Sequence, residues 1–404
     1  MKTVEEHLAD VLAVVRPLGP LAVPLLDAHG CVLADDIVSD AAVPSFANSA
    51  MDGYAVVAAD VAGAEEARPA LLPVDGDVPA GPAPALTVAP GRCVRIMTGA
   101  VLPPGADAVV PVEWTDGGVA EVRVFRPAEP GLNIRGAGED VRPGQTVLTA
   151  GTVLGPAQVG LLAVVGRPAV RVRPRPRVVV LSTGSELVEP GRPLAPGQIH
   201  DSNSYALTAA AREAGAQATR AAGVPDDPRA LRAALEDLLV RADLVVTSGG
   251  VSVGAYDVVK QVLREAGTVT FSQVAMQPGK PQAFGTLGPA ATPFFGLPGN
   301  PVSALVSFEV FVRPALRRML GLEPVQRPPV TAVLSEPVRK LRGRRQYRRV
   351  TLTERDGVAV ATPVGGTGSH LMAGLAAAGG LAVLPEDVDA VPAGGAVDVL
   401  VLGP

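Results

Sequence analysis

The chain has 404 residues, 48% of them hydrophobic, and a formal net charge of −5. At about 100–200 residues per domain, this length predicts about two to four domains. The composition excludes a disordered chain, and the acidic charge balance argues against a general nucleic-acid-binding protein.

The first predicted element is a helix over residues 4–16. Thr3 and Glu6 have the spacing of a capping box, in which each side chain binds the backbone N–H of the other residue. Apolar residues follow at helical spacing, and Pro17 ends the pattern.

Residues 21–170 predict a mostly β region. Short Val, Ala and Leu runs alternate there with Pro-Gly, Asp-Gly and Gly-Ala breakers. Residues 171–177 alternate Arg with Val or Pro, which predicts an extended linker because proline cannot donate to a sheet. A nucleic-acid-binding arm is the less favoured interpretation of this segment, since the rest of the chain is acidic.

From residue 177 strand and helix patterns alternate, which predicts a sheet rich in parallel strands and covered by helices on both faces. The last helix should be kinked by Pro314. Predicted strands cover 178–181, 216–224, 244–246, 268–271 and 294–297, and predicted helices cover 203–215, 227–242, 257–266 and 300–320.

Residues after Pro324 return to a strand pattern, which suggests a small barrel or sandwich. The expected fold class is therefore multidomain, with α/β and β domains. The strands are predicted at 329–334, 347–353, 357–363, 381–384 and 396–402.

Several classes of protein receive no support. Cys31 and Cys93 are too few for a disulfide framework or a four-cysteine zinc site, and the four histidines show no ligand spacing. The longest apolar runs, such as 161–165, fall far short of the ~18 residues of a membrane-spanning helix. The acidic N-terminal segment has no apolar signal core, so we expect a cytoplasmic protein.

Polar loops follow the strands of the 177–320 region, and the carboxyl ends of parallel strands share one edge of the sheet. We therefore expect these loops to meet there. They are residues 182–186, 225–227, 247–254 and 298–303.

Two features of these loops suggest anion and metal binding. Gly249 and Gly250, flanked by Ser and Thr, can present N–H and hydroxyl groups to a phosphate, although such loops are often only tight turns. The carboxylates of Glu186, Asp226 and Asp257 beside an anion site suggest Mg²⁺. Asp226 and Asp257 can equally be N-cap residues of helices. Glu is not a favoured N-cap residue, so this alternative does not apply as readily to Glu186.

Lys280 lies between Gly279 and Pro281 in a loop that two prolines make rigid. It is either an anion-binding cation or a solvated surface lysine. In the N-terminal β region, residues 48–55, 97–100 and 133–140 combine glycines with polar groups in predicted loops, where function concentrates.

Taken together, these segments resemble the MoeA family, the molybdopterin molybdenumtransferases, which are related to the E domain of gephyrin. The resemblance extends from residue 1 to about 402. It rests on seven motifs in the same order: Asn48–Ala55, Met97–Ala100, Asn133–Arg135 with Gly138–Asp140, Ser182–Leu187, Ser248–Gly254, Pro278–Pro281 and Leu297–Ser303.

The resemblance implies an elongated homodimer of four-domain subunits. Residues 1–46 and 145–175 would form one discontinuous domain, 47–144 an inserted β domain, 176–323 a MogA-like α/β domain, and 324–404 a C-terminal β-barrel. The active site is expected between the α/β domain of one subunit and the inserted β domain of the other. A MogA-type adenylyltransferase and molybdoenzyme apo-proteins are the implied partners, without nucleic acid or membrane.

The family reaction inserts molybdate into adenylylated molybdopterin, releases AMP and uses Mg²⁺. The resemblance implies that Glu186, Asp226 and Asp257 place the metal ion, while Asp52 and Thr98 reach in from the other subunit. With Lys280, these five residues form the implied catalytic set. The implied substrate-binding residues are Arg135, Ser182, Thr183, Gly184, Ser248, Gly249, Gly250, Ser252, Pro298, Asn300, Pro301, Ser303, Arg344 and Ser369, of which Ser303, Arg344 and Ser369 would bind molybdate together with Lys280.

The chain departs from the family pattern at a few positions. Ala47 stands where Asp is frequent, and Gln273 and Gln277 stand where Lys is found. Fewer cations would weaken that side of an anion site. Gly136 and Ala137 replace bulkier residues and would alter access to the cleft.

Two other functions compete with insertion of molybdate. A MogA-like adenylyltransferase would share the α/β core but would need neither the inserted domain nor the barrel, and it would depend on ATP. A non-catalytic scaffold related to gephyrin would not need the carboxylates or Lys280. Tungstate is a tetrahedral dianion like molybdate, so the residues leave the choice of metal open.

Overall fold

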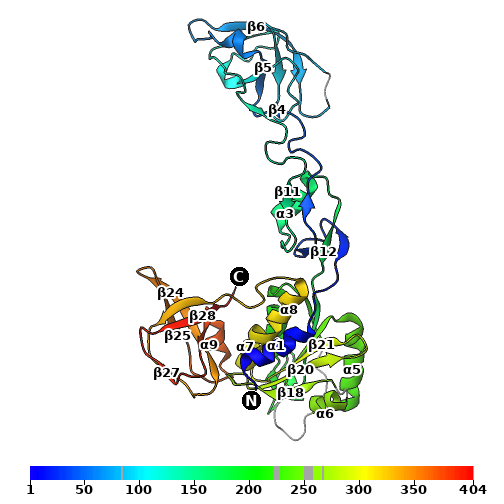
Figure 1. The fold of residues 1–404 in the computed structure, drawn as a ribbon, viewed down its shortest axis with the longest axis vertical. Coiled ribbons are helices and arrows are strands. Elements are labelled where there is room, and N and C mark those ends of the chain that lie inside the picture. The colour runs from blue at the N-terminus through cyan, green and yellow to red at the C-terminus, as the bar shows by residue number, and fades with distance from the viewer. Residues whose placement is uncertain (83–84, 222–226, 250–257, 266–267, 404) are drawn as a thin grey trace. The chain divides into compact units, whose positions relative to one another are not determined.

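The computed structural model describes residues 1–82, 85–221, 227–249, 258–265 and 268–403 (Figure 1). The chain divides into two compact units. Unit 1 contains Met1–Ala22, Gly30–Ala34 and Arg171–Pro404, and unit 2 contains Val23–His29 and Asp35–Val170. Within the described ranges, no helix is both long and apolar enough to cross a membrane.

Unit 1 is built around a six-stranded sheet in the order β16 (Gln217–Arg220), β13 (Arg177–Ser182), β17 (Leu244–Ser248), β21 (Thr292–Leu297), β20 (Pro281–Leu287), β18 (Thr270–Gln273). The first four strands are parallel, as predicted. The sheet is rich in parallel pairs but not purely parallel, because β20 runs antiparallel to both of its neighbours. The sequence pattern did not predict β20, because it contains Pro281 and Gly285, which are residue types typical of turns. The strand expected at 268–271 is displaced to β18.

The two faces of this sheet pack against different helices, because successive side chains of a strand point to opposite faces. Val178 and Val180 pack in the core formed with α1 (Val4–Val14), α4 (Asn203–Glu213) and the helix that begins at residue 301. Val179 and Leu181 face α5 (Pro228–Arg241) and α6 (Val258–Glu265). Both faces are therefore buried, and Figure 1 shows α5 and α6 away from α1.

The predicted capping box of α1 is present: the Glu6 N–H donates to the Thr3 hydroxyl, and the Thr3 N–H donates to the Glu6 carboxylate. The helix ends at Val14 rather than residue 16, because Val15 is already extended. Pro17 disfavours helical geometry in the residue before it, which fits this earlier end.

The helix predicted over 300–320 has three parts: α7 (Pro301–Ser307), a π-helical turn (Phe308–Val312) and α8 (Arg313–Leu320). The expected irregularity at Pro314 thus takes the form of a widened turn just before it. In that turn the Arg313 N–H donates to the Phe308 carbonyl five residues earlier. Proline has no N–H to donate to the preceding turn, and a π-turn accommodates this loss.

The C-terminal part of unit 1 is a closed barrel. Five strands pair in the order β24 (Arg345–Arg355), β25 (Val358–Pro363), β22 (Val330–Leu334), β28 (Ala396–Val401), β26 (Gly380–Leu384), and β26 pairs back to β24. Val350, Ala361 and Val399 belong to its apolar core. Smaller elements absent from the sequence prediction are β23 (Val338–Arg339), α9 (Met372–Ala376) and β27 (Ala390–Val391).

The prediction of an extended linker over residues 171–177 is wrong at both ends of the segment. Arg171 to Arg173 belong to β12 (Ala169–Arg173), which pairs with β2 (Val32–Leu33), and Arg177 begins β13. Val170 and Val172 are buried, so the alternation of arginine with valine is that of a half-buried strand. Other short strands are β1 (Leu21–Pro24), β14 (Leu187–Val188), β15 (Ile199–His200) and β19 (Met276–Gln277).

Unit 2 is mainly β, as predicted. Its five-stranded sheet has the order β8 (Ala108–Pro111), β5 (Gly53–Val56), β7 (Cys93–Ile96), β6 (Ala70–Val78), β9 (Glu121–Val124). Tyr54 and Val56 pack in one core, and Ala55 packs in another with Val94 and Ile96. The remaining elements are β3 (Ile37–Val38), β4 (Asn48–Ser49), α2 (Ala58–Val61), a 3-10 turn (Val112–Trp114), β10 (Ile134–Arg135), β11 (Thr146–Leu148) and α3 (Pro156–Val164).

Candidate active site

Three strands of the six-stranded sheet end side by side. Ser182 at the end of β13 pairs in register with Ser248 at the end of β17, and Ser248 pairs with Leu297 at the end of β21. Because these strands are parallel, the loops that follow them begin at one edge of the sheet. We call this the carboxyl edge. It brings together the first residues of three loops that the sequence singled out.

A buried carboxylate orients the hydroxyl of Ser182. Asp201, which is 5% exposed, accepts a hydrogen bond from the Ser182 hydroxyl over 3.1 Å. It also accepts hydrogen bonds from the N–H and the hydroxyl of Ser204, and the Arg220 guanidinium lies 3.9 Å away. Sequence reasoning missed Asp201, although an Asp-Ser-Asn run before a helical pattern is typical of a helix start.

Asn203 joins two loops of the carboxyl edge. Its side-chain amide donates to the Ser248 hydroxyl and to the Gly299 carbonyl, each over 2.7 Å. The residue stands at the first position of α4, so the helix fixes its direction. This is a second residue that sequence reasoning missed, because its role depends on a contact with strand ends far away in the chain.

The backbones of the same loops approach one another at Gly249. Its φ is +94°, and an added Cβ would lie 2.9 Å from the Thr183 carbonyl oxygen. The Thr183 N–H donates to the Ser248 carbonyl, and the Gly249 N–H donates to the Leu297 carbonyl. A glycine is therefore required here by conformation and by space.

Of the three carboxylates predicted to hold Mg²⁺, the structure describes only Glu186. Glu186 is exposed in the loop after β13, and its carbonyl accepts a hydrogen bond from the Ile199 N–H. Asp226, Asp257, Gly250 and Ser252 lie outside the described residues. Among the residues that the structure does describe, no group of three or more His, Cys, Asp or Glu side chains is arranged to hold a metal ion. The metal set stays a prediction.

The loop that carries Lys280 is held by a buried glutamine. The Gln282 amide donates to the Gly279 carbonyl and to the Ser307 hydroxyl of α7, each over 2.6 Å. An added Cβ at Gly279, where φ is +102°, would lie 2.7 Å from that hydroxyl oxygen. Lys280 is half-buried, and its ammonium group makes no hydrogen bond or ion pair to another described residue.

Two further predicted site residues are Arg344, which lies near the strand before the Lys280 loop, and Ser369, which contacts α7. β19, just before the Lys280 loop, pairs with the start of β24, where Met276 is opposite Arg345, the neighbour of Arg344. At the other position the Val302 N–H donates to the Ser369 carbonyl over 2.9 Å. The first turn of α7, with Pro301 at its start and Ser303 buried within it, thus contacts the barrel segment of Ser369. Pro298 and Asn300 lie in the connection before this turn.

Arg349 holds the segment that carries Ser369. It is 3% exposed, and its guanidinium donates to the carbonyls of Gly366, Gly368 and Leu371. Burial, with a smaller effect of neighbouring Arg348, lowers the pKa of Arg349. Sequence reasoning treated this arginine as an ordinary strand residue, because its three acceptors are backbone atoms that carry no sequence signal.

Unit 2 contains a separate polar cluster. The Thr98 N–H and hydroxyl both donate to the same Asp52 carboxylate oxygen, over 2.6 and 2.8 Å. These hydrogen bonds stabilise the charged carboxylate, so they lower the pKa of Asp52. Two residues paired in the prediction are therefore in direct contact.

The three singled-out segments of unit 2 also meet in space. The Gly99 N–H donates to the Ser49 carbonyl, and the Ala50 N–H donates to the Asn133 carbonyl. In the β4–β10 pair, Arg135 is opposite Asn48. Segments 48–55, 97–100 and 133–135 therefore form one cluster.

The carboxyl edge offers chemistry suited to a polyanion. Thr183 and Ser248 supply hydroxyl groups, the Ser182 hydroxyl can only accept because it donates to Asp201, and the Lys280 loop supplies a cation held through Gln282 by the helix that contains Ser303. Hydroxyls, backbone N–H groups and a cation together bind phosphates and oxyanions. Asp201 and Asn203 fix two of the hydroxyls before any ligand arrives.

Family models match nearly the whole chain. A model described as "MoeA N-terminal region (domain I and II)" matches residues 2–166, "Probable molybdopterin binding domain" matches 179–318, and "MoeA C-terminal region (domain IV)" matches 331–402.

Curated proteins and solved structures agree with these models. "Molybdopterin molybdenumtransferase 2" of Mycobacterium tuberculosis is 50% identical over 400 residues, which cover 98% of each chain. "Molybdopterin molybdenumtransferase 1" of the same organism is 42% identical over 422 residues, covering 100% of this chain and 99% of the relative. The crystal structure of the molybdopterin biosynthesis moea protein from Pyrococcus horikosii covers 100% of this chain and 99% of its own, with a TM-score of 0.79 and 36% identity.

Proposed function

Because this chain belongs to the MoeA family, we propose that the carboxyl edge of its six-stranded sheet is where molybdopterin is bound for insertion of molybdenum. The chain is a molybdopterin molybdenumtransferase of molybdenum cofactor biosynthesis. The observation that carries the proposed location is the register of Ser182, Ser248 and Leu297, which aligns three polar loops at one edge.

In this proposal the residues of the edge bind and orient the substrates. The Ser248 hydroxyl accepts from Asn203 and donates its own proton to a phosphate group of the substrate, whereas the Ser182 hydroxyl donates to Asp201 and accepts from an N–H group of the pterin. Lys280 and Ser303 bind molybdate, a tetrahedral dianion, through charge and hydroxyl donation. Arg344 and Ser369 complete this oxyanion subsite from the barrel side. No side chain acts as a nucleophile, because the dithiolene sulfurs of molybdopterin become the ligands of molybdenum.

We propose in addition a form of the substrate, a leaving group and a metal ion for this reaction. The substrate is adenylylated molybdopterin, and the adenylate leaves as AMP. The carboxylate of Glu186 is a hard oxygen donor in an exposed loop, which fits a partly hydrated Mg²⁺ held together with Asp226 and Asp257. When bound, Mg²⁺ would neutralise charge on the phosphate groups. We place the reaction in the cytoplasm.

We also propose that the working protein is a homodimer. Asp52, Thr98 and Arg135 of unit 2 would serve the carboxyl edge of the other subunit. The Asp52–Thr98 contact supports a role for this cluster, because it holds a charged carboxylate at a surface loop.

Mixing two variants, at a molybdate concentration low enough that each alone is nearly inactive, tests this arrangement. Asp52→Ala damages only unit 2, and Lys280→Gln damages only unit 1. If each cleft combines two subunits, heterodimers contain one intact cleft of two, and about a quarter of wild-type activity returns on subunit exchange. If each cleft lies within one chain, no activity returns, which would refute the shared site.

The assay of function uses purified full-length protein, adenylyl-molybdopterin, Mg²⁺ and molybdate. Molybdate-dependent AMP release and reconstitution of a cofactor-free molybdoenzyme are the expected results. Lys280→Gln should weaken molybdate binding about 10- to 150-fold, since a charge-assisted hydrogen bond contributes about 1.5–3 kcal/mol, whereas Lys280→Arg keeps the charge and should lose less. Parallel reactions with tungstate compare the two oxyanions.

Other results would support other functions. ATP-dependent adenylylation of molybdopterin would indicate a MogA-like adenylyltransferase. Tight pterin binding without turnover would indicate a scaffold, and Gln273 and Gln277 would then be the first positions to restore to Lys.

A further inference from the structure

Lys280 is the only charged residue between Gln273 and Gln282, so this loop presents its positive charge at a single point. Two hydrogen bonds hold the backbone on either side of it. The Lys280 carbonyl accepts from the Val274 N–H over 2.8 Å. The Gly279 carbonyl accepts from the Gln282 amide over 2.6 Å. Because peptide units are planar, anchoring the two units that flank the Lys280 Cα sets the direction in which its side chain leaves the backbone.

The same Gln282 amide joins the loop to α7, because it also donates to the Ser307 hydroxyl over 2.6 Å. Side chains of a strand alternate between the two faces of the sheet, and Gln282 lies on the face of Phe284, which packs in the core that contains α7. Gly279 comes so close to Ser307 that an added Cβ would lie 2.7 Å from the hydroxyl oxygen. The loop backbone therefore rests directly on the helix.

Both hydrogen bonds of the Gln282 amide are closed to water. Gln282 is 2% exposed, and Ser307 is 0% exposed. A substitution that keeps the volume of Gln282 but removes its amide therefore leaves no room for water to replace these hydrogen bonds. Such a change would detach the Lys280 loop from the helix while leaving Lys280 itself in the chain.

α7 also carries the other side of the proposed oxyanion subsite. Ser303 stands four residues before Ser307, on the same face of the helix and about 6 Å away along its axis. In that first turn the Val302 N–H donates to the Ser369 carbonyl. The position of the Lys280 loop is thus set relative to the helix that holds Ser303 and contacts the segment of Ser369.

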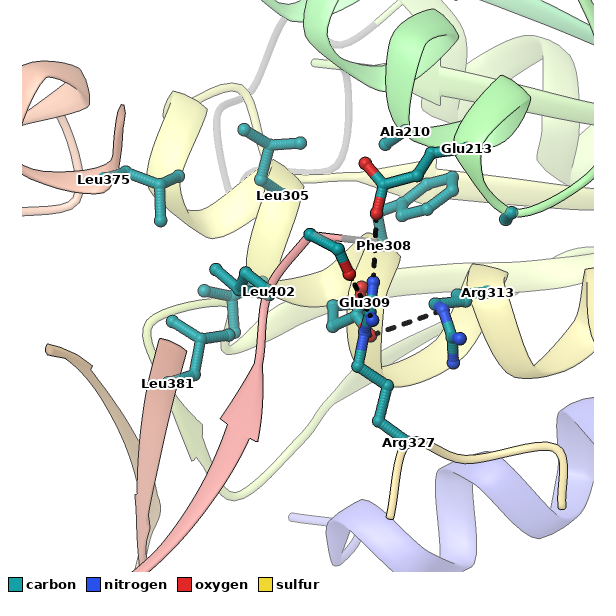
Figure 2. A pocket seen from close by; sticks show the side chains of 13 residues that line it. Ala210, Glu213, Leu305, Phe308, Glu309, Arg313, Arg327, Leu375, Leu381 and Leu402 are labelled. Atoms are coloured by element: carbon teal, nitrogen blue, oxygen red, sulfur yellow. Dashed lines mark hydrogen bonds and ion pairs between the residues drawn. The ribbon is translucent and has the colours of Figure 1, made fainter. Parts of the chain in front are cut away.

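The opposite side of α7 packs against the barrel. Leu305 stands midway between Ser303 and Ser307 in the chain and therefore points away from them, because each residue turns the helix by about 100°. Figure 2 shows Leu305 across from leucines of the barrel side, and these belong to or pack against the same apolar core: Leu375, Leu381 and Leu402. The helix is therefore held independently of the Lys280 loop and can serve as its frame.

We propose that Gln282 is a positioning residue for the oxyanion subsite. By tying the Lys280 loop to Ser307, it holds the Lys280 ammonium at a fixed separation from Ser303, so that both groups meet one molybdate ion. The inference rests on the proposed function, which assigns Lys280 and Ser303 to molybdate. It adds that a neutral, buried side chain that does not touch the anion sets the affinity for it.

Gln282→Met tests this role, because methionine nearly keeps the length and volume of the side chain and lacks the amide. Molybdate should bind the full-length variant about tenfold more weakly in calorimetric titrations, because a displaced cation forms a poorer charge-assisted hydrogen bond. In the transferase assay the KM for molybdate should rise about tenfold at nearly unchanged kcat, and the KM for adenylyl-molybdopterin should stay within about twofold. Ser307→Ala keeps the hydrogen bond to Gly279 and should weaken molybdate binding about threefold.

A double-mutant cycle with Lys280→Gln shows whether Gln282 acts through Lys280. If it does, adding Gln282→Met to Lys280→Gln should weaken molybdate binding by less than about twofold. A further loss of about tenfold in that background would overturn the proposal. Unchanged binding by Gln282→Met beside weakened binding by Lys280→Gln would overturn it too, and would leave the proposed function standing. Unchanged binding by Lys280→Gln itself would refute the proposed subsite and this inference with it.

Leu287→Ala is the control for a general loss of stability. Leu287 is buried at the other end of β20, so its truncation destabilises the sheet without touching the Lys280 loop. Molybdate affinity should stay at the wild-type level in this variant. An equal loss of affinity in folded Leu287→Ala would show that destabilisation alone explains the result, which overturns the proposal. If Gln282→Met does not fold, Ser307→Ala takes its place in every comparison.

Discussion

His7 makes the stability of unit 1 dependent on pH. The side chain is 3% exposed on α1, and its ring packs edge-on against Phe311 with centroids 4.7 Å apart. Nδ1 is buried without a hydrogen-bond partner among the described residues. Burial, and then the charge of Lys2, lowers the pKa of His7 from 6.5 to about 4, while Asp10 opposes the shift.

The sign of the effect follows from linkage. Between pH 6.5 and about 4 the unfolded chain binds a proton at His7 and the folded chain does not, so stability falls as the pH falls. The contribution is complete above pH 6.5. About 2 kcal/mol of it is lost by pH 5, and about 3 kcal/mol is lost once the pH is below the folded pKa.

His7→Phe removes this titration and keeps an aromatic ring in the core. We expect the loss of unfolding free energy between pH 7 and pH 5 to be about 2 kcal/mol smaller in this variant than in the wild type. Urea titrations followed by circular dichroism measure the difference, and His29→Gln at an exposed position is the matched control. An identical pH dependence in His7→Phe and wild type, or a His7 ring that titrates near 6.5 by NMR in the folded protein, would refute the reasoning.

Three further variants test residues around the candidate site. Asp201→Ala leaves three donors without an acceptor and should lower the unfolding free energy by about 3 kcal/mol, whereas Asp201→Asn should cost about half as much; equal costs in urea titrations would contradict this. Gly249→Ala adds a clash with Thr183 to an unfavourable φ and should destabilise by about 2–3 kcal/mol, whereas Gly91→Ala, with a φ of +75° and open space, should cost only about 1 kcal/mol. Arg349→Lys should lose about 2 kcal/mol and speed amide exchange in residues 366–371, because an ammonium group cannot reach all three carbonyls; unchanged exchange would show that the segment is held otherwise.

Local patterns predicted the fold well where one element's own residues determine it. The capping box of α1 and the buried runs of β13 and β17 are examples, because caps and apolar periodicity are local. β20 escaped prediction because its proline and its glycine resemble a turn, and only pairing on both sides makes it a strand. Tertiary context overrides propensity in such segments.

Some residues of the candidate site were likewise predictable from local sequence patterns, and others were not. Loops after strands were recognisable, because sheet geometry places strand ends together, and Ser182 and Ser248 lie there. Asp201, Asn203 and Arg349 were not recognisable as site residues, since each acts through a hydrogen bond to a residue distant in the chain or to backbone atoms.

The order in which the chain is made has a consequence for α1. This helix forms part of the core of unit 1, yet the residues of unit 2 are synthesised before the sheet that covers it. At about 5–20 residues per second, a ribosome needs roughly 15–60 s to proceed from α1 to the end of α8. Until β20 and the 301–320 helix are made, Val4, Leu8 and Val11 have no native partner in those elements, whereas all residues of unit 2 are present once residue 170 has been made. We therefore expect the apolar face of nascent α1 to remain without its partners for most of translation.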